Sequence, residues 1–280
     1  MTVKIITDTL SDITGDLVDE LGIIVVPLYV RFGEEVYRDR VEITTEDFYR
    51  RLVSESTFPS TTQPTPNDFA EVYNDVAKEA DEILVIVVSS KLSGTYQSAT
   101  QAKEGFEGKC RIEIVDSLSV AMGMGLIVIS AAKAVQAGAN LDEVTKLARG
   151  AVSRSHMVIY FDTLKYLAKG GRIGKAQGLL GSMLSVKPIL TMKDGEMAPL
   201  TRMRSLNAGM DYLYNAVAGV PKIEELAVEH TTNPADADAM TERLSAVYPK
   251  ERIYRSDISP VIGVHAGPNA LAVSLIEAEK

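Results

Sequence analysis

Short apolar runs alternate with amphipathic helical patterns in the first half of the chain. The runs at Val3–Thr7, Ile83–Val88 and Arg111–Asp116 predict strands, and Ile83–Val88 is aliphatic throughout, as a strand buried on both faces requires. The β-rich segment Ile23–Val30 contains Pro27, which predicts an edge strand or a bulge. Spacing and capping residues predict helices that end at about Leu21 before Gly22, span Thr44–Ser54, begin at Thr65-Pro66, span Ala121–Ala137, and begin at Asn140 with Glu143. This alternation is typical of a parallel sheet with crossover helices.

The rhythm of the pattern changes from about His156. Strands are predicted at Met157–Phe161, Lys187–Met192, Glu196–Leu200, Ile223–Glu229, Arg252–Arg255 and Val261–Val264, and helices at Ser205–Val217 and Pro234–Val247. Asp194-Gly195 separates two of these strands and predicts a tight hairpin turn. The second half therefore predicts an α+β arrangement with some antiparallel pairing.

We expect an α/β protein of two domains. An N-terminal parallel-sheet α/β domain is assigned to residues 1–155, and a C-terminal α+β domain packed against it is assigned to residues 156–280. The boundary is approximate, and segments of the two domains are free to interleave. Because the chain has no internal repeat and no low-complexity linker, we expect the halves to pack closely around a ligand cleft.

Composition excludes several classes of protein. Apolar residues make up 46% of the 280 residues and charged residues 24%, which is a normal globular balance. One Cys and three scattered His cannot form an internal disulfide or a Cys-based zinc site, so we expect an intracellular protein without a structural metal. A net charge of −9 argues against binding to nucleic acid and against general attraction to anionic lipid.

Two further features bear on location. The apolar stretch Ser117–Ala132 has 16 uncharged residues and is shorter than the roughly 20 that a membrane-spanning helix needs. The N-terminal sequence lacks the apolar core of a signal peptide. We therefore expect a cytoplasmic protein.

The familiar enzyme motifs are not present. Gly174-Lys175 is followed by Ala176 and preceded by Lys169 at the position of the first P-loop glycine, so the nucleotide-binding motif fails at both ends. Gly123-Met124-Gly125 has Val128 where the dinucleotide fingerprint requires a third Gly. The chain also has no Gly-x-Ser-x-Gly or His-Glu-x-x-His motif, and no catalytic residue is assigned.

Three polar clusters remain, each at the end of a predicted strand or the start of a helix. Ser89–Thr95 follows the buried strand and opens a helix, where free N–H groups favour a small anion, although such a segment is more often an ordinary Ser N-cap. Ser60–Pro64 is a hydroxyl-rich turn that is also typical of a solvated loop. Val264–Pro268 places His265 after an apolar run, either as a functional or as a structural His.

The segment Thr163–Lys193 carries only positive charge inside an acidic protein. It contains Lys165, Lys169, Arg172, Lys175, Lys187 and Lys193 and no Asp or Glu. Such a loop could meet a phosphate or an acidic partner, or could simply be a solvated surface. The apolar, Gly- and Met-rich part at Gln177–Val186 is expected to line a cavity or to join the core.

Taken together, these segments resemble the DegV family, the fatty-acid-binding subunits of bacterial fatty acid kinase. The resemblance runs nearly from end to end and is carried by Ile5–Thr9, Thr61–Thr65, Ser89–Ser98, Val115–Ser117, Leu167–Ile173 and His265–Pro268. Two positions depart from the family pattern: Thr62 stands where Ser is usual, and Asn269 stands where Gly is usual. Neither departure removes a hydroxyl or the His.

The resemblance implies one long-chain fatty acid buried between two α/β domains. It assigns the carboxylate to Thr61 or Thr62, with Ser93 and Gly94, places Arg172 and His265 near the mouth, and puts Arg202 or Arg204 on the same kinase-facing side. The protein would be a carrier without a cofactor, not a catalyst. A separate ATP-dependent kinase would convert the presented carboxylate to acyl-phosphate for phospholipid synthesis, with transient membrane contact as part of lipid exchange.

Two other functions stay open on the residues alone. One is an enzyme acting on a phosphorylated small molecule, with Ser93 and Arg172 holding phosphate and His265 as general acid–base. The other is a regulatory module whose bound lipid or other small ligand controls a partner. A fatty acid that co-purifies with the protein would favour the carrier over the enzyme, and an assay with the kinase would separate the carrier from the regulator.

Overall fold

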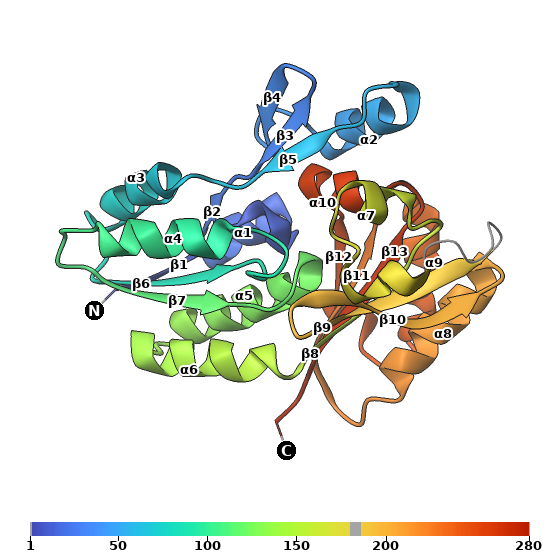
Figure 1. Cartoon of the computed structure of the whole chain (residues 1–280). Helices are drawn as coiled ribbons and strands as arrows, with labels where there is room; N and C mark the ends of the chain where they lie inside the picture. The colour runs from blue at the N-terminus through green and yellow to red at the C-terminus, as the bar shows by residue number, and fades with distance from the viewer. Residues whose placement is uncertain (1, 180–185, 280) are drawn as a thin grey trace.

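The computed structural model describes residues 2–179 and 186–279. Figure 1 shows two large sheets side by side, each with helices packed on its faces, and a small third sheet above them. The predicted α/β class, with a parallel sheet in the first half and a mixed sheet in the second, is confirmed. The apolar segment Gln177–Val186 lies mostly outside the described residues.

Four parallel strands form the first sheet in the order β2-β1-β6-β7. They are β1 (Val3–Asp8), β2 (Ile23–Val26), β6 (Glu82–Val87) and β7 (Arg111–Asp116). Helices α3 (Pro66–Val76) and α4 (Thr95–Glu104) cover one face, and α1 (Gly15–Leu21), α5 (Ala121–Gln136) and α6 (Leu141–Val152) cover the other (Figure 1). Ile83 and Val85 of β6 pack with α3 and α4, whereas Leu84 and Ile86 pack with α5. The aliphatic strand is therefore buried on both faces, as its sequence predicts.

Six strands form the second sheet in the order β10-β9-β8-β13-β11-β12. They are β8 (Ser155–Tyr160), β9 (Lys187–Lys193), β10 (Glu196–Met203), β11 (Ile223–His230), β12 (Ile253–Asp257) and β13 (Leu271–Glu277). Neighbouring strands pair antiparallel except β11 and β12. Helices α8 (Leu206–Ala218) and α9 (Pro234–Leu244) pack on one face, and α5 packs on the other.

Helix α5 lies between the two large sheets. It contacts β1 and β6 of the first sheet and β8, β11 and β13 of the second. All twelve residues from Ala121 to Ala132 are buried. The uncharged stretch is thus a helix enclosed by protein, which explains why it is apolar all round. Among the described residues, no helix is both long enough and apolar enough to cross a membrane.

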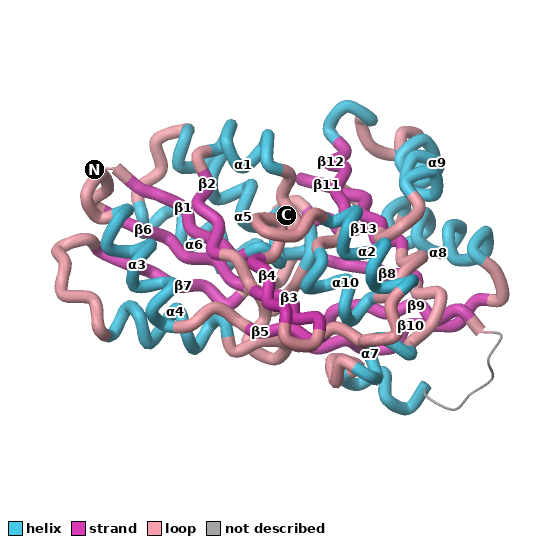
Figure 2. Tube along the Cα trace, turned by 90° about the horizontal axis from the view of Figure 1, so that it is seen from above, coloured by secondary structure: helices cyan, strands magenta, loops and turns pink. Residues whose placement is uncertain are grey.

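The small sheet connects the first half of the chain to the second. Its strands are β3 (Tyr29–Phe32), β4 (Glu35–Arg38) and β5 (Ser60–Thr62), in the antiparallel order β4-β3-β5. The predicted segment Ile23–Val30 is divided at Pro27. Its first part, β2, lies at the edge of the parallel sheet as predicted, and its end belongs to β3, the central strand of the small sheet. Helix α10 (Pro260–Ala266) packs against β3, β5 and α2 (Thr45–Ser54), as the view from above also shows (Figure 2).

Several local predictions are confirmed by their hydrogen bonds. Thr65 caps α3 in a reciprocal capping box with Asp68, and Asn140 caps α6 in the same way with Glu143. The β9–β10 hairpin turns at Asp194-Gly195 with φ values of 54° and 80°. The remaining short helices are α7 (Lys165–Lys169), η1 (Thr9–Ser11), η2 (Gly174–Leu179) and η3 (Lys250–Arg252).

One predicted element is wrong and several were missed. Val261–Val264 is not a strand: it lies in α10, which begins with Ser259 at the N-cap and Pro260 at its first position. A run of four apolar residues fits either structure, and the start signal just before it decides for the helix. The missed strands are β4 and β5 of the small sheet and β13, which lies in the interior of the mixed sheet between β8 and β11.

The division of the chain near residue 155 stays a prediction. The strands of the parallel sheet end by Asp116, and those of the mixed sheet begin at Ser155. Helix α5 packs against both, so the two halves share part of one core.

Close packing of α5 gives a test with a matched control. A Cβ at position 125 would collide with the carbonyl oxygen of Ser11, whereas a Cβ at position 150 in α6 meets no atom within 4 Å. We expect Gly125→Ala to lower the free energy of unfolding by roughly 1–3 kcal/mol through overpacking. Gly150→Ala should raise it by about 0.5–1 kcal/mol, the usual gain of Ala over Gly in a helix. Urea unfolding of both variants checks this, and equal stabilities would contradict the packing of α5 described here.

Candidate functional site

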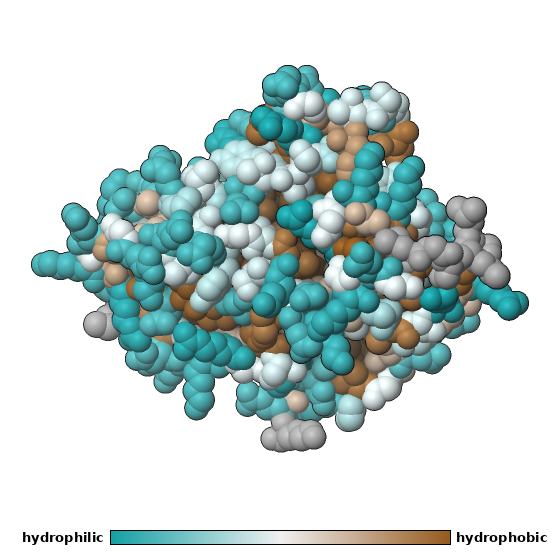
Figure 3. All heavy atoms as spheres, viewed as in Figure 1, coloured by the Kyte–Doolittle hydropathy of each residue, from teal (hydrophilic) through white to brown (hydrophobic). Residues whose placement is uncertain are grey.

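A cavity of about 170 Å³ lies between the two halves of the protein. Its apolar walls come from both large sheets and the segments that follow them, and include Leu10, Val88 and Val120 from the first half and Met157, Ile159 and Phe161 from the second. Figure 3 shows hydrophobic atoms in the depression between the halves. The site is therefore a largely apolar space whose walls depend on the packing of the halves against each other.

Five of the site residues predicted from the sequence line this cavity. They are Thr61, Thr62, Ser93, Arg172 and His265. The two Thr residues end β5, Ser93 lies in the loop between β6 and α4, Arg172 follows α7, and His265 lies in the last turn of α10. Segments far apart in the sequence thus place hydroxyl, imidazole and guanidinium groups around one space.

Thr61 and His265 connect the small sheet to the second half of the chain. The Oγ1 atom of Thr61 lies 3.2 Å from Nε2 of His265. The other ring nitrogen, Nδ1, is buried without a hydrogen-bond partner among the described residues. It packs against Gly170, where a Cβ would collide with the imidazole. Gly170 is therefore needed for the close approach of α7 to α10.

His265 is held in its neutral form. Burial, and to a smaller extent the nearby charge of Arg172, lowers its pKa from 6.5 to about 4. At neutral pH the imidazole can therefore donate one hydrogen bond and accept another without carrying charge. A neutral donor beside hydroxyl groups suits an anionic ligand that brings its own charge into the site.

Ser93 belongs to a small hydrogen-bond network that includes a residue not selected from the sequence. Its Oγ lies 2.8 Å from Oγ1 of Thr95, at the start of α4. The N–H of Gly94, which the resemblance assigns to a ligand carboxylate, donates to Oε1 of Gln63 at 3.3 Å. Gln63 also lines the cavity. The sequence signal that could have identified Gln63 as a site residue is its position directly after Thr62 in the hydroxyl-rich turn.

Arg172 joins the two halves at the edge of the cavity. Its Nε donates to the carbonyl oxygen of Leu92 at 3.2 Å, and its Nη1 donates to that of Gly170 at 2.9 Å. The side chain is exposed and forms no ion pair with a carboxylate of the described residues. Its charge is therefore available to an anion.

Arg202 and Arg204 lie elsewhere. Arg202 is in β10, the edge strand of the mixed sheet, and Arg204 follows it. Both are exposed and neither lines the cavity. The segment after Arg172 packs against the same strand, since Gly174 approaches the backbone of Met197. Within residues 2–179 and 186–279, no group of three or more His, Cys, Asp or Glu side chains is arranged to hold a metal ion.

Comparison with known proteins finds relatives that match nearly the whole chain. The model of the family described as "Uncharacterised protein, DegV family COG1307" matches residues 2–278. A DegV domain-containing protein from Caldanaerobacter subterraneus subsp. tengcongensis is 37% identical over 276 residues, which cover 97% of each chain.

Solved structures match equally completely. A fatty-acid-binding DegV family protein from Thermus thermophilus is 32% identical with a TM-score of 0.92, and the match covers 99% of this chain and 100% of that one. DegV of Bacillus subtilis, described as a fatty acid binding protein, is 28% identical with a TM-score of 0.90 over 99% and 100% of the two chains. The family model and the relatives each span almost every residue of the fold described above, and the chain belongs to the DegV family.

Proposed function

We propose that the protein binds one long-chain fatty acid in the cavity and presents its carboxylate to a separate ATP-dependent fatty acid kinase. The observation that carries this proposal is the form of the cavity, which is apolar along its walls and has hydroxyl groups and a neutral imidazole in one region. Related DegV proteins described as fatty-acid-binding support it. In this role the protein is a cytoplasmic carrier, and the kinase forms the acyl-phosphate for phospholipid synthesis.

The tail would supply most of the affinity. Each buried methylene contributes about 0.8 kcal/mol, so a 16-carbon tail could contribute roughly 10–12 kcal/mol before the costs of association. The cavity of about 170 Å³ is lined mainly by apolar side chains, which a hydrocarbon tail can contact without leaving polar groups unsatisfied. Walls of this kind favour a lipid over a phosphorylated polar metabolite.

The head group would determine the orientation of the lipid. A buried carboxylate is costly unless several donors meet it, and Thr61, Thr62 and Ser93 provide hydroxyl groups. With its proton on Nε2, His265 donates to Thr61 and leaves the Thr61 hydroxyl hydrogen free to point at the carboxylate. Gly94 would act through Gln63, which its N–H already holds.

The basic residues would serve the transfer step. Phosphorylation adds negative charge to the head group, and Arg172 lies at the cavity without a carboxylate partner among the described residues. We assign Arg202 and Arg204 to the surface that meets the kinase, because their strand packs against the segment that follows Arg172. Transient membrane contact would supply the fatty acid.

The most direct test is the identity of the bound molecule. We expect the purified protein to carry one long-chain fatty acid per chain, measured by mass spectrometry under gentle conditions and after extraction. Val261→Phe, which places a ring on the cavity side of α10, should lower the lipid content, whereas Val247→Phe on the exposed surface should not. A phosphorylated small molecule in place of lipid, or equal lipid content in both variants, would contradict the proposed ligand site.

The hydroxyl groups can be tested separately from the fold. We expect Thr62→Ala combined with Ser93→Ala to lower phosphorylation of bound lipid by about tenfold or more, since a hydrogen bond to a charged group contributes ~1.5–3 kcal/mol. The matched control, Ser54→Ala with Thr100→Ala, removes two hydroxyls that bond to helix carbonyls outside the cavity. Thermal unfolding of both pairs measures stability. Equal phosphorylation by the cavity pair and wild type, with lipid bound, would show that these hydroxyls do not hold the head group.

Arg172 should affect the kinase step more than lipid binding. We expect Arg172→Ala to keep its fatty acid and to lose most productive coupling to the kinase, because its charge would meet the phosphate and not the tail. Arg50→Ala, at an exposed arginine of α2 paired with Asp47, is the control. A pull-down with the kinase and lipid analysis separate the two effects. Loss of lipid with normal coupling would assign Arg172 to the binding site instead.

A further inference from the structure

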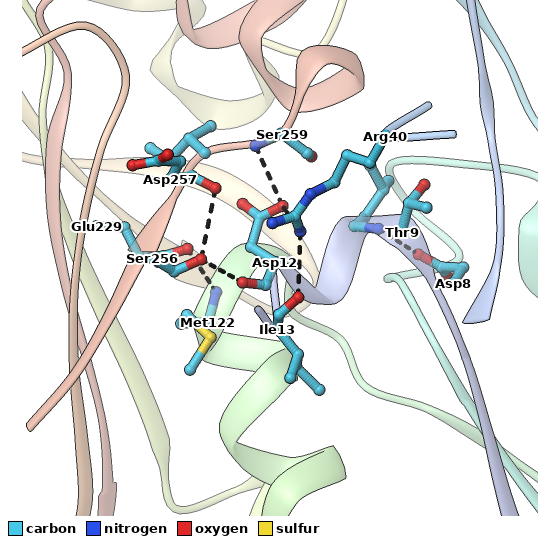
Figure 4. Close-up of polar contacts among 12 residues, drawn as sticks. Asp8, Thr9, Asp12, Ile13, Arg40, Met122, Glu229, Ser256, Asp257 and Ser259 are labelled. Atoms are coloured by element: carbon cyan, nitrogen blue, oxygen red, sulfur yellow. Dashed lines mark hydrogen bonds and ion pairs between the residues drawn. The ribbon is translucent and has the colours of Figure 1, made fainter. Parts of the chain in front are cut away.

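Four carboxyl groups lie completely buried where the first and second halves of the chain meet. They are Asp8 and Asp12 around η1, Asp39 after β4, and Glu229 in β11. Figure 4 shows Asp12 and Glu229 beside each other, with Arg40 as the neighbouring cation. The closest approach of Arg40 to this pair is 3.9 Å, from Nη1 to Oδ1 of Asp12. One guanidinium at that distance cannot neutralise two carboxylates in an apolar interior.

Each carboxyl group of the pair uses one oxygen to hold the other half of the protein. Oδ1 of Asp12 accepts from the backbone N–H of Ser259 at 3.2 Å, and Oε1 of Glu229 accepts from that of Met122 at 2.9 Å. The carbonyl oxygen of Asp12 also accepts from the Ser256 hydroxyl. The contacts therefore cross the junction in both directions, from the first half to β12 and α10 and from β11 to α5.

The other oxygen of each group has no partner among the described residues. Oδ2 of Asp12 and Oε2 of Glu229 are both buried without a hydrogen bond to any other group. Two bare, charged oxygens at this place would repel each other and lack water. A single proton carried by Glu229 and donated to Asp12 satisfies both oxygens at once and leaves one charge for Arg40 to balance.

The surroundings favour retention of that proton. Burial raises the pKa of Asp12 to about 6 and that of Glu229 well above its ordinary value, and the neighbouring charge of Asp12 raises the latter further. Arg40 and Ser259 lower the pKa of Asp12, and the Met122 N–H lowers that of Glu229, without outweighing burial.

Other titratable groups face the pair from the elements around it. Burial raises the pKa of Asp8 to about 7 and of Asp39 to about 8, and it raises that of Tyr49 in α2, whose hydroxyl donates to the carbonyl oxygen of Ile258 at 3.0 Å. From β11 and β12, His230 and Asp257 form a pair at 3.0 Å, and this contact lowers the pKa of Asp257. These groups supply no second cation within hydrogen-bond distance of Glu229 among the described residues.

Helix α10 links the pair to the cavity. Ser259, which donates to Asp12, is the N-cap residue of α10. Val261 and Ile262 in its first turn and His265 in its last turn line the cavity. A helix of seven residues that is fixed at its start has little freedom at its other end. The position of His265 therefore depends on the contact at Ser259.

We propose that Asp12 and Glu229 share one proton and act as positioning residues, because the protonated pair joins the two halves and holds the start of α10. Loss of that proton places two negative charges at the junction, loosens α10 and weakens retention of the molecule in the cavity. The proposal of a shared proton is argued from the contacts of the pair alone, whereas its predicted effect on a bound fatty acid rests on the proposed function.

The direction of the pH effect follows from proton binding. The folded protein keeps a proton that the unfolded chain releases above its ordinary carboxyl pKa, so stability falls as pH rises and levels off once the folded pair has lost the proton. From about pH 5 to 8 the unfolding equilibrium constant of wild type should rise with pH more steeply than that of Glu229→Gln, by up to about tenfold per pH unit for the one proton. The amide of Gln keeps a donor for Asp12 but carries no titrating proton.

The experiment uses the full chain as wild type, Glu229→Gln and Glu225→Gln. Glu225 is the matched control, because it is buried on the same strand and is paired with Lys133 at 2.5 Å. We expect the infrared band of a protonated carboxylic acid at neutral pH to lose one group's intensity in Glu229→Gln and to be unchanged in Glu225→Gln. The pH slope of unfolding should change in the same variant only. Release of a fluorescent long-chain fatty acid should accelerate with pH in wild type and Glu225→Gln and stay nearly constant in Glu229→Gln.

The outcomes separate the parts of the proposal. An unchanged acid band and pH slope in Glu229→Gln would overturn the shared proton. If the acid band and the pH slope change in Glu229→Gln but fatty acid release keeps the pH dependence of wild type, the positioning of α10 by the pair would be overturned. Wild type that binds no fatty acid would refute the proposed function, and the band and slope would still decide the proton. If Glu229→Gln does not fold, the infrared titration of Asp8→Asn combined with Asp39→Asn decides. These substitutions remove the other buried carboxyl groups with raised pKa values, so the remaining acid band belongs to the pair and must persist at neutral pH and weaken above it.

Discussion

The packing of α5 between two sheets is the constraint on which the rest of the structure depends. A helix buried on every side over its first three turns admits no charged residue there, and Ala121–Ala132 contains none. Its close contact with η1 requires Gly125. Because the sheets meet across this helix, the space that remains near its first residues becomes the cavity, which Val120 and Ala121 line.

The same end of α5 also brings the second feature of the junction into place. The backbone N–H of Met122 holds Glu229, and η1, which packs against α5, leads directly to Asp12. The cavity and the carboxyl pair are therefore neighbours because both are built around the start of one helix. Helix α10 then spans from the pair to the polar side of the cavity. This geometry would link occupation of the cavity to the proton that we propose the pair shares.

The sequence predicted those parts of the fold that local rules determine. Capping at Thr65 and Asn140, the turn at Asp194-Gly195 and the buried strand Ile83–Val88 depend on residues near in sequence, and all were predicted correctly. The prediction of a strand at Val261–Val264 was wrong because four apolar residues fit a strand as well as a helix turn. Strands β5 and β13 depend on pairing with distant segments, which no local pattern reports. The β3–β4 hairpin is local, with its turn at Gly33-Glu34, and was missed although a short-range signal was present.

The site was predictable in its polar part and not in its apolar part. Thr62, Ser93, Arg172 and His265 stand in recognisable segments, and they line one cavity. In the sequence, the apolar residues that line the cavity look like ordinary core residues. A residue that faces a cavity differs from one that faces another side chain only in what it packs against, which the sequence does not show. The buried carboxyl groups were missed for a related reason: Asp8 and Asp12 read as a polar break between elements, and Glu229 as the polar end of a strand.

A helix shared by two sheets has a consequence for how the molecule comes apart. Separation of the mixed sheet would expose one apolar side of α5 to water, and separation of the parallel sheet would expose the opposite side. Near this helix, neither sheet has a hydrophobic core of its own that would remain buried without the other sheet. The polypeptide should therefore unfold in a single cooperative step, although its topology divides into two sheets that the chain connects through α5 and α6.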